Sequence, residues 1–411
     1  MITDKTTLLS RYGKEKADAL ENYLKTRFES VQKEKSLNVV YDLLHQCDIC
    51  CLGCGTNAIM TSLPTVICEE MTLKQIEEVI KKIKKYCDKK NITPFVNYGG
   101  GEPFLRSDIL QVLELTADVL GSNCIGIDTN ASLQNSYEQI CAALPYVSYI
   151  GISINGLESY HNWWSNNSRI NAYANATSVI RRICQNKEYA NKIEVTSVAT
   201  KKNYKTLRNL MEYLKELGVK NYSVHRAIPV GRMLARADEL VPDANEYLEL
   251  LVDVVSASEK LSINAHVHHS IEAIYAALLF GINTYDNENV VNTNFRSSIS
   301  IDPSGEVLID PWCTTGFWKN LTLGNVHTPN FSFDAVFSGK FNDINKVRLA
   351  FDKTVRCHGC TRNCSGGSRI VAAVSEINRY GKDIGEIGQL VEALKAKDPA
   401  CPLAYSEKGR V

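Results

Sequence analysis

Hydrophobic and polar positions along the chain follow two alternating periods. Six short runs rich in β-branched residues are typical of strands. They lie between about residues 39 and 229 and read VVYDLLH, PFVNYGG, IGIDTN, VSYIGISI, IEVTSVAT and YSVHRAIP. Between them, segments such as 73–86 and 204–217 carry apolar residues three and four positions apart, as helices that cover a sheet do. Repeated units of this kind predict parallel strands in a doubly wound sheet or a barrel, with any chemistry at the carboxyl ends of the strands.

The regions on either side of this repeat have different patterns. Residues 10–36 have apolar positions on one face, which predicts an N-terminal helical segment that caps a barrel. After the last repeat we expect a helix near 244–259, a strand at SINAHVHH, another helix, and a hairpin over 298–313 with a Ser304-Gly305 turn. The domains that we expect are 1–37, 38–235, 236–296 and 297–411.

Composition narrows the range of partners and compartments. The 46 basic residues balance 46 acidic ones, so the overall charge attracts neither nucleic acid nor an anionic membrane. The start, MITDKTTLLSRYGKEKAD, has no apolar signal core, and no apolar stretch of about 18 residues follows, which favours a cytoplasmic protein. In a long chain of this kind, 14 cysteines favour metal or redox chemistry over disulfides.

Four of the cysteines fall in the segment QCDICCLGCGTN, just after the first predicted strand. Read with gaps of three and then two residues, Cys47, Cys51 and Cys54 form a CxxxCxxC triplet on one short loop. Three such thiolates suit three irons of a cubane cluster and leave the fourth iron open to a substrate or cofactor. A structural zinc site with Cys50 as the fourth ligand is the alternative, although adjacent thiols fit tetrahedral geometry poorly.

Several motifs in register resemble those of the radical SAM enzymes over about residues 38–232. CxxxCxxC follows the first strand, GGGEP the second, TNA the third and SINGLESYH the fourth. The resemblance implies an α/β fold with a partial (β/α)6 TIM-type barrel, in which Cys47, Cys51 and Cys54 hold a 4Fe–4S cluster whose open iron chelates S-adenosylmethionine. The cofactor-binding residues that it implies are Gly53, Gly100, Gly101, Glu102, Asn130, Ser153, Asn155 and Arg169.

The resemblance also implies roles for individual residues. Gly100, Gly101 and Glu102 would hold the amino end of the methionine, and Ser153 with Asn155 would reach the ribose. These residue types agree with that chemistry, since glycines let the backbone approach a ligand and a carboxylate accepts bonds from an ammonium group.

Three positions depart from the family pattern. Gly53 stands where an aromatic residue usually lies along the adenine, so another side chain must pack there. Asn155 stands where Asp is common. The usual His-Asp-x-x-Arg run reads HNWWS, which lacks an arginine expected near the methionine carboxylate, and Arg169 is the candidate replacement. Trp163 and Trp164 in that run either cover the cofactor or pack in the core.

The C-terminal cysteines resemble the SPASM or Twitch extensions of the same family, over about residues 297–405. DPSGEVLIDPWC, LGNV, CHGCTRNCSGG and ACPLAY follow that layout, but Ser368 stands where a CxGGC motif would end, and too few cysteines remain for two clusters. We therefore expect one auxiliary 4Fe–4S cluster in a C-terminal α+β domain, with a zinc ribbon as the alternative. Its expected ligands are Cys357, Cys360, Cys364 and Cys401.

Two further features leave their roles open. Cys313, at the end of the hairpin, is either a replacement ligand for the auxiliary cluster or a thiol that donates a hydrogen atom to a substrate radical. His266, His268 and His269 cluster on a predicted strand and read as ordinary polar positions, with ligands or a proton relay as the alternative.

The function that the resemblance implies is that of an oxidoreductase. Such an enzyme cleaves S-adenosylmethionine to a 5′-deoxyadenosyl radical, which abstracts a hydrogen atom from the substrate. We expect a peptide or protein that is oxidised, crosslinked or epimerised, with a sugar or other small molecule as the alternative. A ferredoxin- or flavodoxin-like reductant is implied, and a separate leader-peptide binder as well, because the 38 residues before the first strand are too few for a winged-helix domain. A non-catalytic iron–sulfur electron carrier is the rival from another class.

Overall fold

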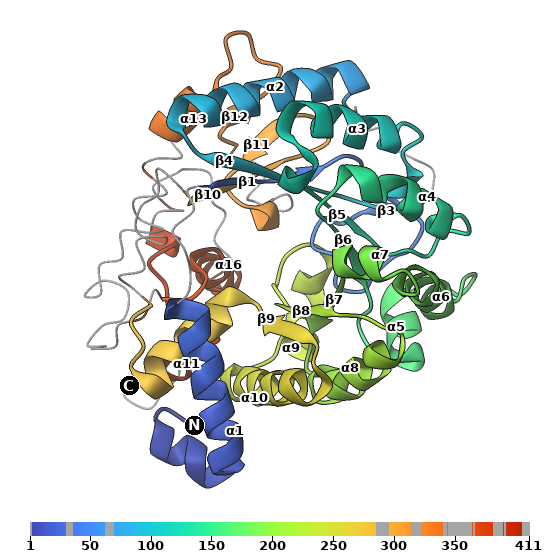
Figure 1. Cartoon of the computed structure of the whole chain (residues 1–411). Helices are drawn as coiled ribbons and strands as arrows, with labels where there is room; N and C mark the ends of the chain where they lie inside the picture. The colour runs from blue at the N-terminus through green and yellow to red at the C-terminus, as the bar shows by residue number, and fades with distance from the viewer. Residues whose placement is uncertain are drawn as a thin grey trace.

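The fold is built around one large curved sheet. The computed structural model describes residues 2–29, 36–61, 70–284, 296–313, 322–339, 343, 364, 366–380, 389 and 392–404. In the described part of the chain, ten strands form the sheet, in the order β12-β11-β10-β1-β4-β5-β6-β7-β8-β9 (Figure 1). These strands are β1 (Ser36–Asp42), β4 (Thr93–Gly99), β5 (Ile125–Thr129), β6 (Tyr149–Ser153), β7 (Ile193–Ala199), β8 (Asn221–Arg226), β9 (Asn264–Val267), β10 (Arg296–Ile301), β11 (Glu306–Leu308) and β12 (Gly324–Asn325).

All six strands predicted from the hydrophobic runs form, as β1 and β4 to β8, and each pairs in parallel with the next. Helices connect them on the outside of the curve, which gives the partial barrel that we expected. The sheet also continues at both edges, because β9 pairs in parallel with β8 and β10 with β1. The connecting helices are α2 (Leu73–Lys90), α3 (Ile109–Leu120), α4 (Ser136–Ala143), α5 (Glu158–Ser165), α6 (Ala172–Cys184), α7 (Lys187–Lys192) and α8 (Leu207–Glu216).

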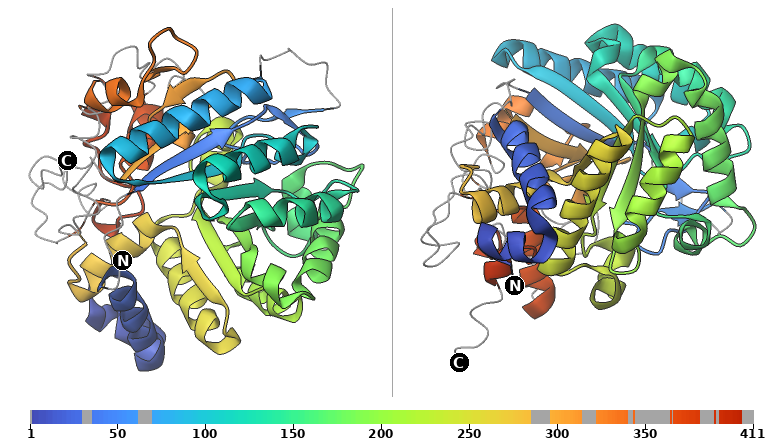
Figure 2. Two further views of the ribbon diagram at one scale, coloured as in Figure 1. Left: turned by 45° about the horizontal axis from the view of Figure 1, so that its top comes forward. Right: turned by 60° about the horizontal axis from the view of Figure 1, so that its bottom comes forward.

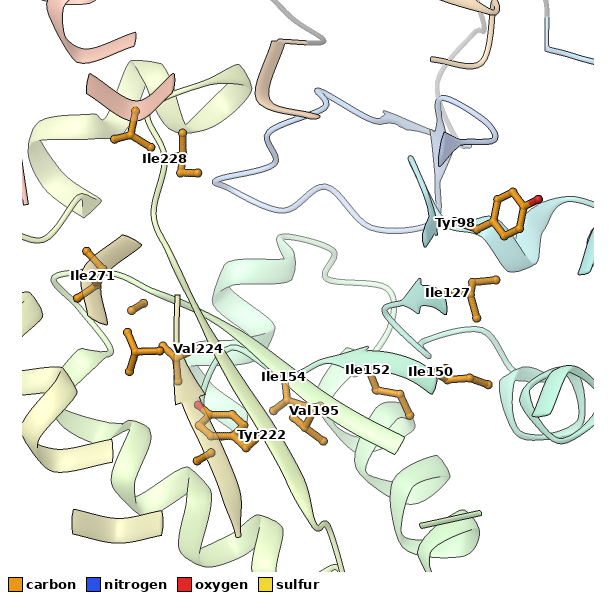
Figure 3. Packing of buried hydrophobic residues seen from close by; sticks show 14 of the residues in the cluster. Tyr98, Ile127, Ile150, Ile152, Ile154, Val195, Tyr222, Val224, Ile228 and Ile271 are labelled. Atoms are coloured by element: carbon orange, nitrogen blue, oxygen red, sulfur yellow. The ribbon is translucent and has the colours of Figure 1, made fainter. Parts of the chain in front are cut away.

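The two faces of the sheet differ in polarity. Along β7, Ile193 and Val195 are fully buried, whereas Glu194 and Thr196 are half-buried. A parallel strand covered on both faces would be apolar at every position, so this alternation means that only the outer face packs against helices. Figure 3 shows side chains of this buried cluster, including Ile150, Ile152, Val195 and Tyr222. The inner face is therefore left for polar groups.

The N-terminal helix is α1 (Lys5–Glu29), which begins earlier than the predicted segment 10–36 and bends at Gly13, where φ is 80°. It packs against α10 (Ala244–Leu261) and α11 (His269–Phe280), and Leu20 and Leu24 are buried in this contact (Figure 2). None of the helices in the described ranges has the length and hydrophobicity that a membrane span requires.

The C-terminal part begins with the predicted hairpin, in which β10 and β11 are antiparallel. Its turn contains Gly305, whose φ is +87°, and Asp302 Oδ1 accepts bonds from the backbone of Ser304 (2.9 Å) and Glu306 (3.0 Å). The prediction of one strand through all three histidines of HVHH was wrong, because β9 ends at Val267 and the next two residues cap and open α11. The domain boundaries stay a prediction.

Candidate functional site

The first cysteine loop lies at the carboxyl end of β1, as predicted. After β1 the chain forms β2 (Gln46–Cys47), which pairs with β3 (Ile59–Met60) and so closes the loop between them. Cys47 is buried, and Cys51 and Cys54 are half-buried and pack against the same small cluster of side chains. The local fold therefore brings the three predicted ligands together.

The three thiols influence one another electrostatically. Burial raises the pKa of the Cys47 and Cys51 thiols well above the usual range, and neighbouring sulfurs raise it further, Cys51 for Cys47 and Cys54 for Cys51. Among the described residues, no group of three or more Cys, His, Asp or Glu side chains is arranged to hold a single metal ion. A cubane cluster takes each thiolate on a different iron, so the sulfurs need not converge on one point. Three thiolates on one short loop are the donor set that a cubane cluster with one open iron takes.

The Gly-Gly-Glu segment after β4 runs directly against the backbone of the cysteine loop. Gly101 N donates to Leu44 O (2.9 Å), and Glu102 N donates to Gln46 O (2.8 Å). A Cβ on Gly101 would lie 1.7 Å from Gln46 O, and Gly100 has a φ of +112°. Glycine is required at both positions, because any side chain would separate the two loops or strain the backbone.

The Glu102 side chain joins this segment to the end of β5. The carboxylate is almost fully buried and accepts bonds from Thr129 Oγ1 (2.8 Å), Asn130 N (2.8 Å) and Phe104 N (3.1 Å). Burial raises the pKa of Glu102 to about 7, and these three donors oppose that shift. Glu102 therefore holds two loops in place in addition to any role toward a ligand.

Asn130 also binds the cysteine loop. Its Nδ2 donates to Asp48 Oδ1 (2.8 Å) and lies 3.6 Å from Cys47 Sγ, and Asp48 accepts a second bond from Ser132 Oγ. Asp48 and Ser132 were not singled out in the sequence. The predicted contact of Asn130 with the cofactor stays a prediction, while its contact with the loop is direct.

The space beside Gly53 is filled by side chains from other parts of the chain. An ideal Cβ on Gly53 would lie 2.4 Å from both Trp164 Cη2 and Met233 Cε. Trp164 is buried in α5, and its backbone oxygen accepts a bond from Leu52 N (2.9 Å). Trp163 is 37% exposed instead. Of the two tryptophans, Trp164 is thus the one that packs against Gly53.

The loop after β6 is held by a neutral histidine. His161 Nδ1 accepts a bond from Asn155 N (3.0 Å), and burial lowers the pKa of His161 to about 4. Asn155 Oδ1 accepts a bond from Val198 N (2.8 Å), so this side chain ties β6 to β7. Ser153 is half-buried at the end of β6, whereas Arg169 is exposed. The structure thus brings Ser153 and Asn155 to the strand ends but leaves Arg169 at the surface.

A further residue, which the sequence analysis missed, holds the cysteine loop from the far side of the barrel. Arg232 donates from Nε to Cys51 O (2.8 Å) and from Nη1 to Ala58 O (2.8 Å), and its backbone N donates to Cys54 O (2.9 Å). The only signal in the sequence was its place shortly after the last barrel strand. Arg232 supplies positive charge beside the thiols, and that charge opposes the rise in the pKa of Cys51.

The C-terminal cysteines occupy two places. Cys313 is buried at the end of the hairpin, next to Trp312, whose ring would lie 3.1 Å from a Cβ on Gly55. The hairpin end therefore lies against the first cysteine loop. Cys364 and Cys401 are half-buried, and Gly366 N donates to Cys364 Sγ (3.1 Å). The other two predicted ligands, Cys357 and Cys360, lie outside the described residues.

The inner face of the barrel carries a row of hydrogen-bonded polar side chains. Asn97 donates to Asp128 (2.7 Å) and accepts from Tyr149 (2.9 Å), while Ser223 Oγ lies 3.1 Å from His266 Nε2. Burial raises the pKa of Asp128 to about 6. These groups lie within strands β4, β5, β6, β8 and β9, below the carboxyl ends where the cysteine loop and the Gly-Gly-Glu segment meet.

Comparison with solved structures identifies proteins of the same fold. The chain is similar to anSMEcpe with bound AdoMet and Cp18Cys peptide, with 15% identity, a TM-score of 0.60 and coverage of 90% of this chain and 95% of that chain. It is also similar to Streptococcus suis SuiB bound to S-adenosylmethionine, with 16% identity, a TM-score of 0.63 and coverage of 98% and 84%. SuiB bound to precursor peptide SuiA gives 16% identity, a TM-score of 0.63 and coverage of 94% and 80%.

These neighbours were solved with S-adenosylmethionine or a peptide bound, and their likeness over most of the chain confirms the expected α/β fold with a partial barrel. No family model matches the chain, and no curated protein matches it in sequence. At such low identities the likeness establishes the fold alone.

The packing at Gly53 leads to a prediction on stability. Gly53→Ala should lower the free energy of unfolding by about 1–3 kcal/mol, because the new methyl group would overlap Trp164 and Met233. Met233→Ala added to Gly53→Ala should recover part of that loss, as a double-mutant cycle in urea would measure. Gly99→Ala is the matched control, since its Cβ would meet Asp42 at an ordinary 3.5 Å. If Gly53→Ala and Gly99→Ala lower the free energy of unfolding equally, the close packing of Trp164 and Met233 against Gly53 is contradicted.

Proposed function

We propose that the chain is a radical SAM enzyme whose first 4Fe–4S cluster is held by Cys47, Cys51 and Cys54. The observation that carries this proposal is that these thiols share one loop and one small side-chain cluster, at the carboxyl edge of a partial barrel and against a Gly-Gly-Glu segment. The donor set suits three irons and leaves a fourth open. When bound there, the cluster and S-adenosylmethionine supply a 5′-deoxyadenosyl radical that can abstract a hydrogen atom from a substrate.

The residues around the loop are suited to bind and orient S-adenosylmethionine. A carboxylate has about four lone-pair sites, and Glu102 uses three of them for protein donors. We propose that the remaining site accepts a bond from the ammonium group, beside the backbone of Gly100 and Gly101. Ser153 and Asn155, at the end of β6, are the proposed ribose contacts, and Arg169 is the proposed partner of the methionine carboxylate.

We propose a peptide substrate, which the enzyme oxidises, crosslinks or epimerises. Two of the similar structures, anSMEcpe and SuiB, were solved with a peptide bound. The half-buried polar wall inside the barrel offers hydrogen-bonding groups to such a substrate. A ferredoxin- or flavodoxin-like protein would supply electrons, and a separate protein would bind any leader segment. A small molecule such as a sugar is the alternative substrate.

We also propose one auxiliary 4Fe–4S cluster with Cys357, Cys360, Cys364 and Cys401 as ligands. Two hydrogen bonds in the described part of the chain support this proposal, because both are made to Asp398. Cys401 N donates to Asp398 O (3.0 Å), and Ser368 N, four residues after Cys364, donates to the Asp398 carboxylate (2.7 Å). Cys313 is a hydrogen donor or a replacement ligand. Its place beside Trp312, which contacts the first cysteine loop, keeps it close to the proposed reaction centre.

The triplet gives the most direct test of this function. Anaerobically reconstituted protein with dithionite should convert S-adenosylmethionine to 5′-deoxyadenosine and methionine, as chromatography would measure. Changing Cys47, Cys51 or Cys54 to Ala should abolish the conversion, whereas Cys50→Ala should largely retain it, because only its backbone is needed for the bond from Cys50 N to Ser165 O (3.0 Å). Activity that depends on Cys50 but not on Cys51 would show that the assignment of ligands is wrong.

Glu102 can be tested by binding alone. Glu102→Ala should weaken S-adenosylmethionine binding by ten-fold or more, since a bond between charged groups contributes about 1.5–3 kcal/mol and about 1.4 kcal/mol is a factor of ten. Thr129→Val is the control, because it removes one protein bond to the carboxylate and leaves its charge in place. Calorimetry should find the affinity of Thr129→Val within about three-fold of the wild type. If Glu102→Ala and Thr129→Val lose affinity for S-adenosylmethionine equally, Glu102 only holds the loops in place and does not bind the ammonium group.

The auxiliary cluster can be tested by iron analysis. The reconstituted chain should contain about eight irons, four for each cubane cluster. The double variant Cys357→Ala/Cys360→Ala should lose about half of them and still cleave S-adenosylmethionine without forming product. Twelve irons, or bound zinc at full activity, would contradict a single auxiliary cluster. Loss of the second cluster in Cys313→Ala but not in Cys401→Ala would make Cys313 the fourth ligand.

A further inference from the structure

One short segment of chain contacts both cysteine regions. It runs from Arg226, the last residue of β8, to Arg232 in the helical turn Gly231–Arg236. Arg232 binds the backbone of the first cysteine loop through the three bonds described above. Arg226 shares the helix-covered face of β8 with Tyr222 and Val224, both fully buried, and binds the C-terminal region instead. Ile228, between the two arginines, is buried in the core (Figure 3).

Arg226 and Asp398 form a bidentate ion pair inside the protein. Nη1 lies 2.9 Å from Oδ2 and Nη2 lies 3.0 Å from Oδ1, and both side chains are 1% exposed. Ser270 Oγ accepts a further bond from Nη1 (3.3 Å), and the Tyr247 ring lies 5.4 Å from the guanidinium carbon. Two desolvated charges are tolerated only in good geometry, so this pair fixes the distance between the barrel and the C-terminal region.

Asp398 in turn holds two segments that carry cysteines. Its Oδ2 accepts a bond from Ser368 N (2.7 Å), and Ser368 lies four positions after Cys364 in the sequence. Its Oδ1 accepts a bond from Ala400 N (2.8 Å), and its backbone oxygen accepts one from Cys401 N (3.0 Å). One aspartate therefore binds the backbone of Cys401 directly and the backbone four residues after Cys364.

We propose that the Arg226–Asp398 pair is a clamp that holds Cys364 and Cys401 on one auxiliary cluster and, through residues 226–232, at a fixed separation from the first cysteine loop. Asp398 is then a positioning residue that touches neither iron nor substrate. This inference rests on the proposed auxiliary cluster. Its consequence is functional, because electron transfer between a substrate radical and a cluster falls steeply with distance.

The test uses the full chain, reconstituted anaerobically. Asp398→Asn removes the charge and turns an amide group toward one of its donors, so the iron content should fall from about eight to about four per chain. Arg226→Lys keeps the charge but not the planar fork. It should retain about eight irons and change the reduction potential and the electron paramagnetic resonance spectrum of the auxiliary cluster.

Asp334→Asn is the matched control. It breaks the exposed ion pair between Asp334 and Lys89 (3.0 Å), which also joins the C-terminal region to a barrel helix. This variant should keep all of the iron and an unchanged spectrum.

The outcomes separate the clamp from the cluster itself. If Cys364→Ala and Cys401→Ala both keep about eight irons, the auxiliary cluster is wrong and the clamp fails with it. A second outcome would overturn the clamp alone. In it, the two cysteine variants lose about half of their iron, whereas Asp398→Asn keeps all of its iron and leaves the reduction potential and the spectrum of the auxiliary cluster unchanged. Should Asp398→Asn fail to fold, as thermal unfolding would reveal, Arg226→Lys decides the question. An unchanged potential and spectrum in that variant would also overturn the clamp.

Discussion

The candidate site depends on the buried carboxylate of Glu102. Its backbone N binds Gln46 O after β1, and its side chain accepts bonds from Phe104 after β4 and from Thr129 and Asn130 at the end of β5. Three loops that are distant in sequence are thereby held at one edge of the sheet. Because a buried carboxylate is costly unless its oxygens are satisfied, these loops cannot separate without exposing an unpaired charge. The cysteine loop consequently has a rigid support on the side of β4 and β5.

The opposite side of the same loop is supported in a different way. Arg232 binds three backbone oxygens of the loop, so the cysteine side chains remain available while the backbone is fixed. Asp398 plays a similar part in the C-terminal region, since its carboxylate also accepts hydrogen bonds from backbone N–H groups of separate segments. In both regions a buried carboxylate outside the cysteine motif binds the backbone of segments that carry or adjoin cysteines.

Much of the fold could be predicted from the sequence, because the barrel strands bury one face completely. The alternation in β7 and the apolar spacing of α2 follow directly from that burial. The cysteine triplet and Gly-Gly-Glu were also recognisable, since their spacing is local. The edges of the sheet were harder to predict, because β9 has only four residues and its neighbour is chosen by tertiary contacts. Arg232, Asp48 and Asp398 were missed because each acts on residues far away in the chain, and no local pattern marks such contacts.

One departure from the pattern of the radical SAM enzymes, which the chain resembles, has a physical counterpart elsewhere in the chain. Gly53 lacks the aromatic side chain usual before the third cysteine, and the HNWWS run carries Trp164. In the structure, Trp164 of that run occupies the space beside Gly53, so closely that a side chain at position 53 would overlap it. An aromatic residue at 53 and Trp164 in its present rotamer therefore exclude each other sterically. The glycine in the cysteine loop and the tryptophan in α5 therefore depend on each other, since the ring beside position 53 comes from the helix and leaves room only for a glycine in the loop.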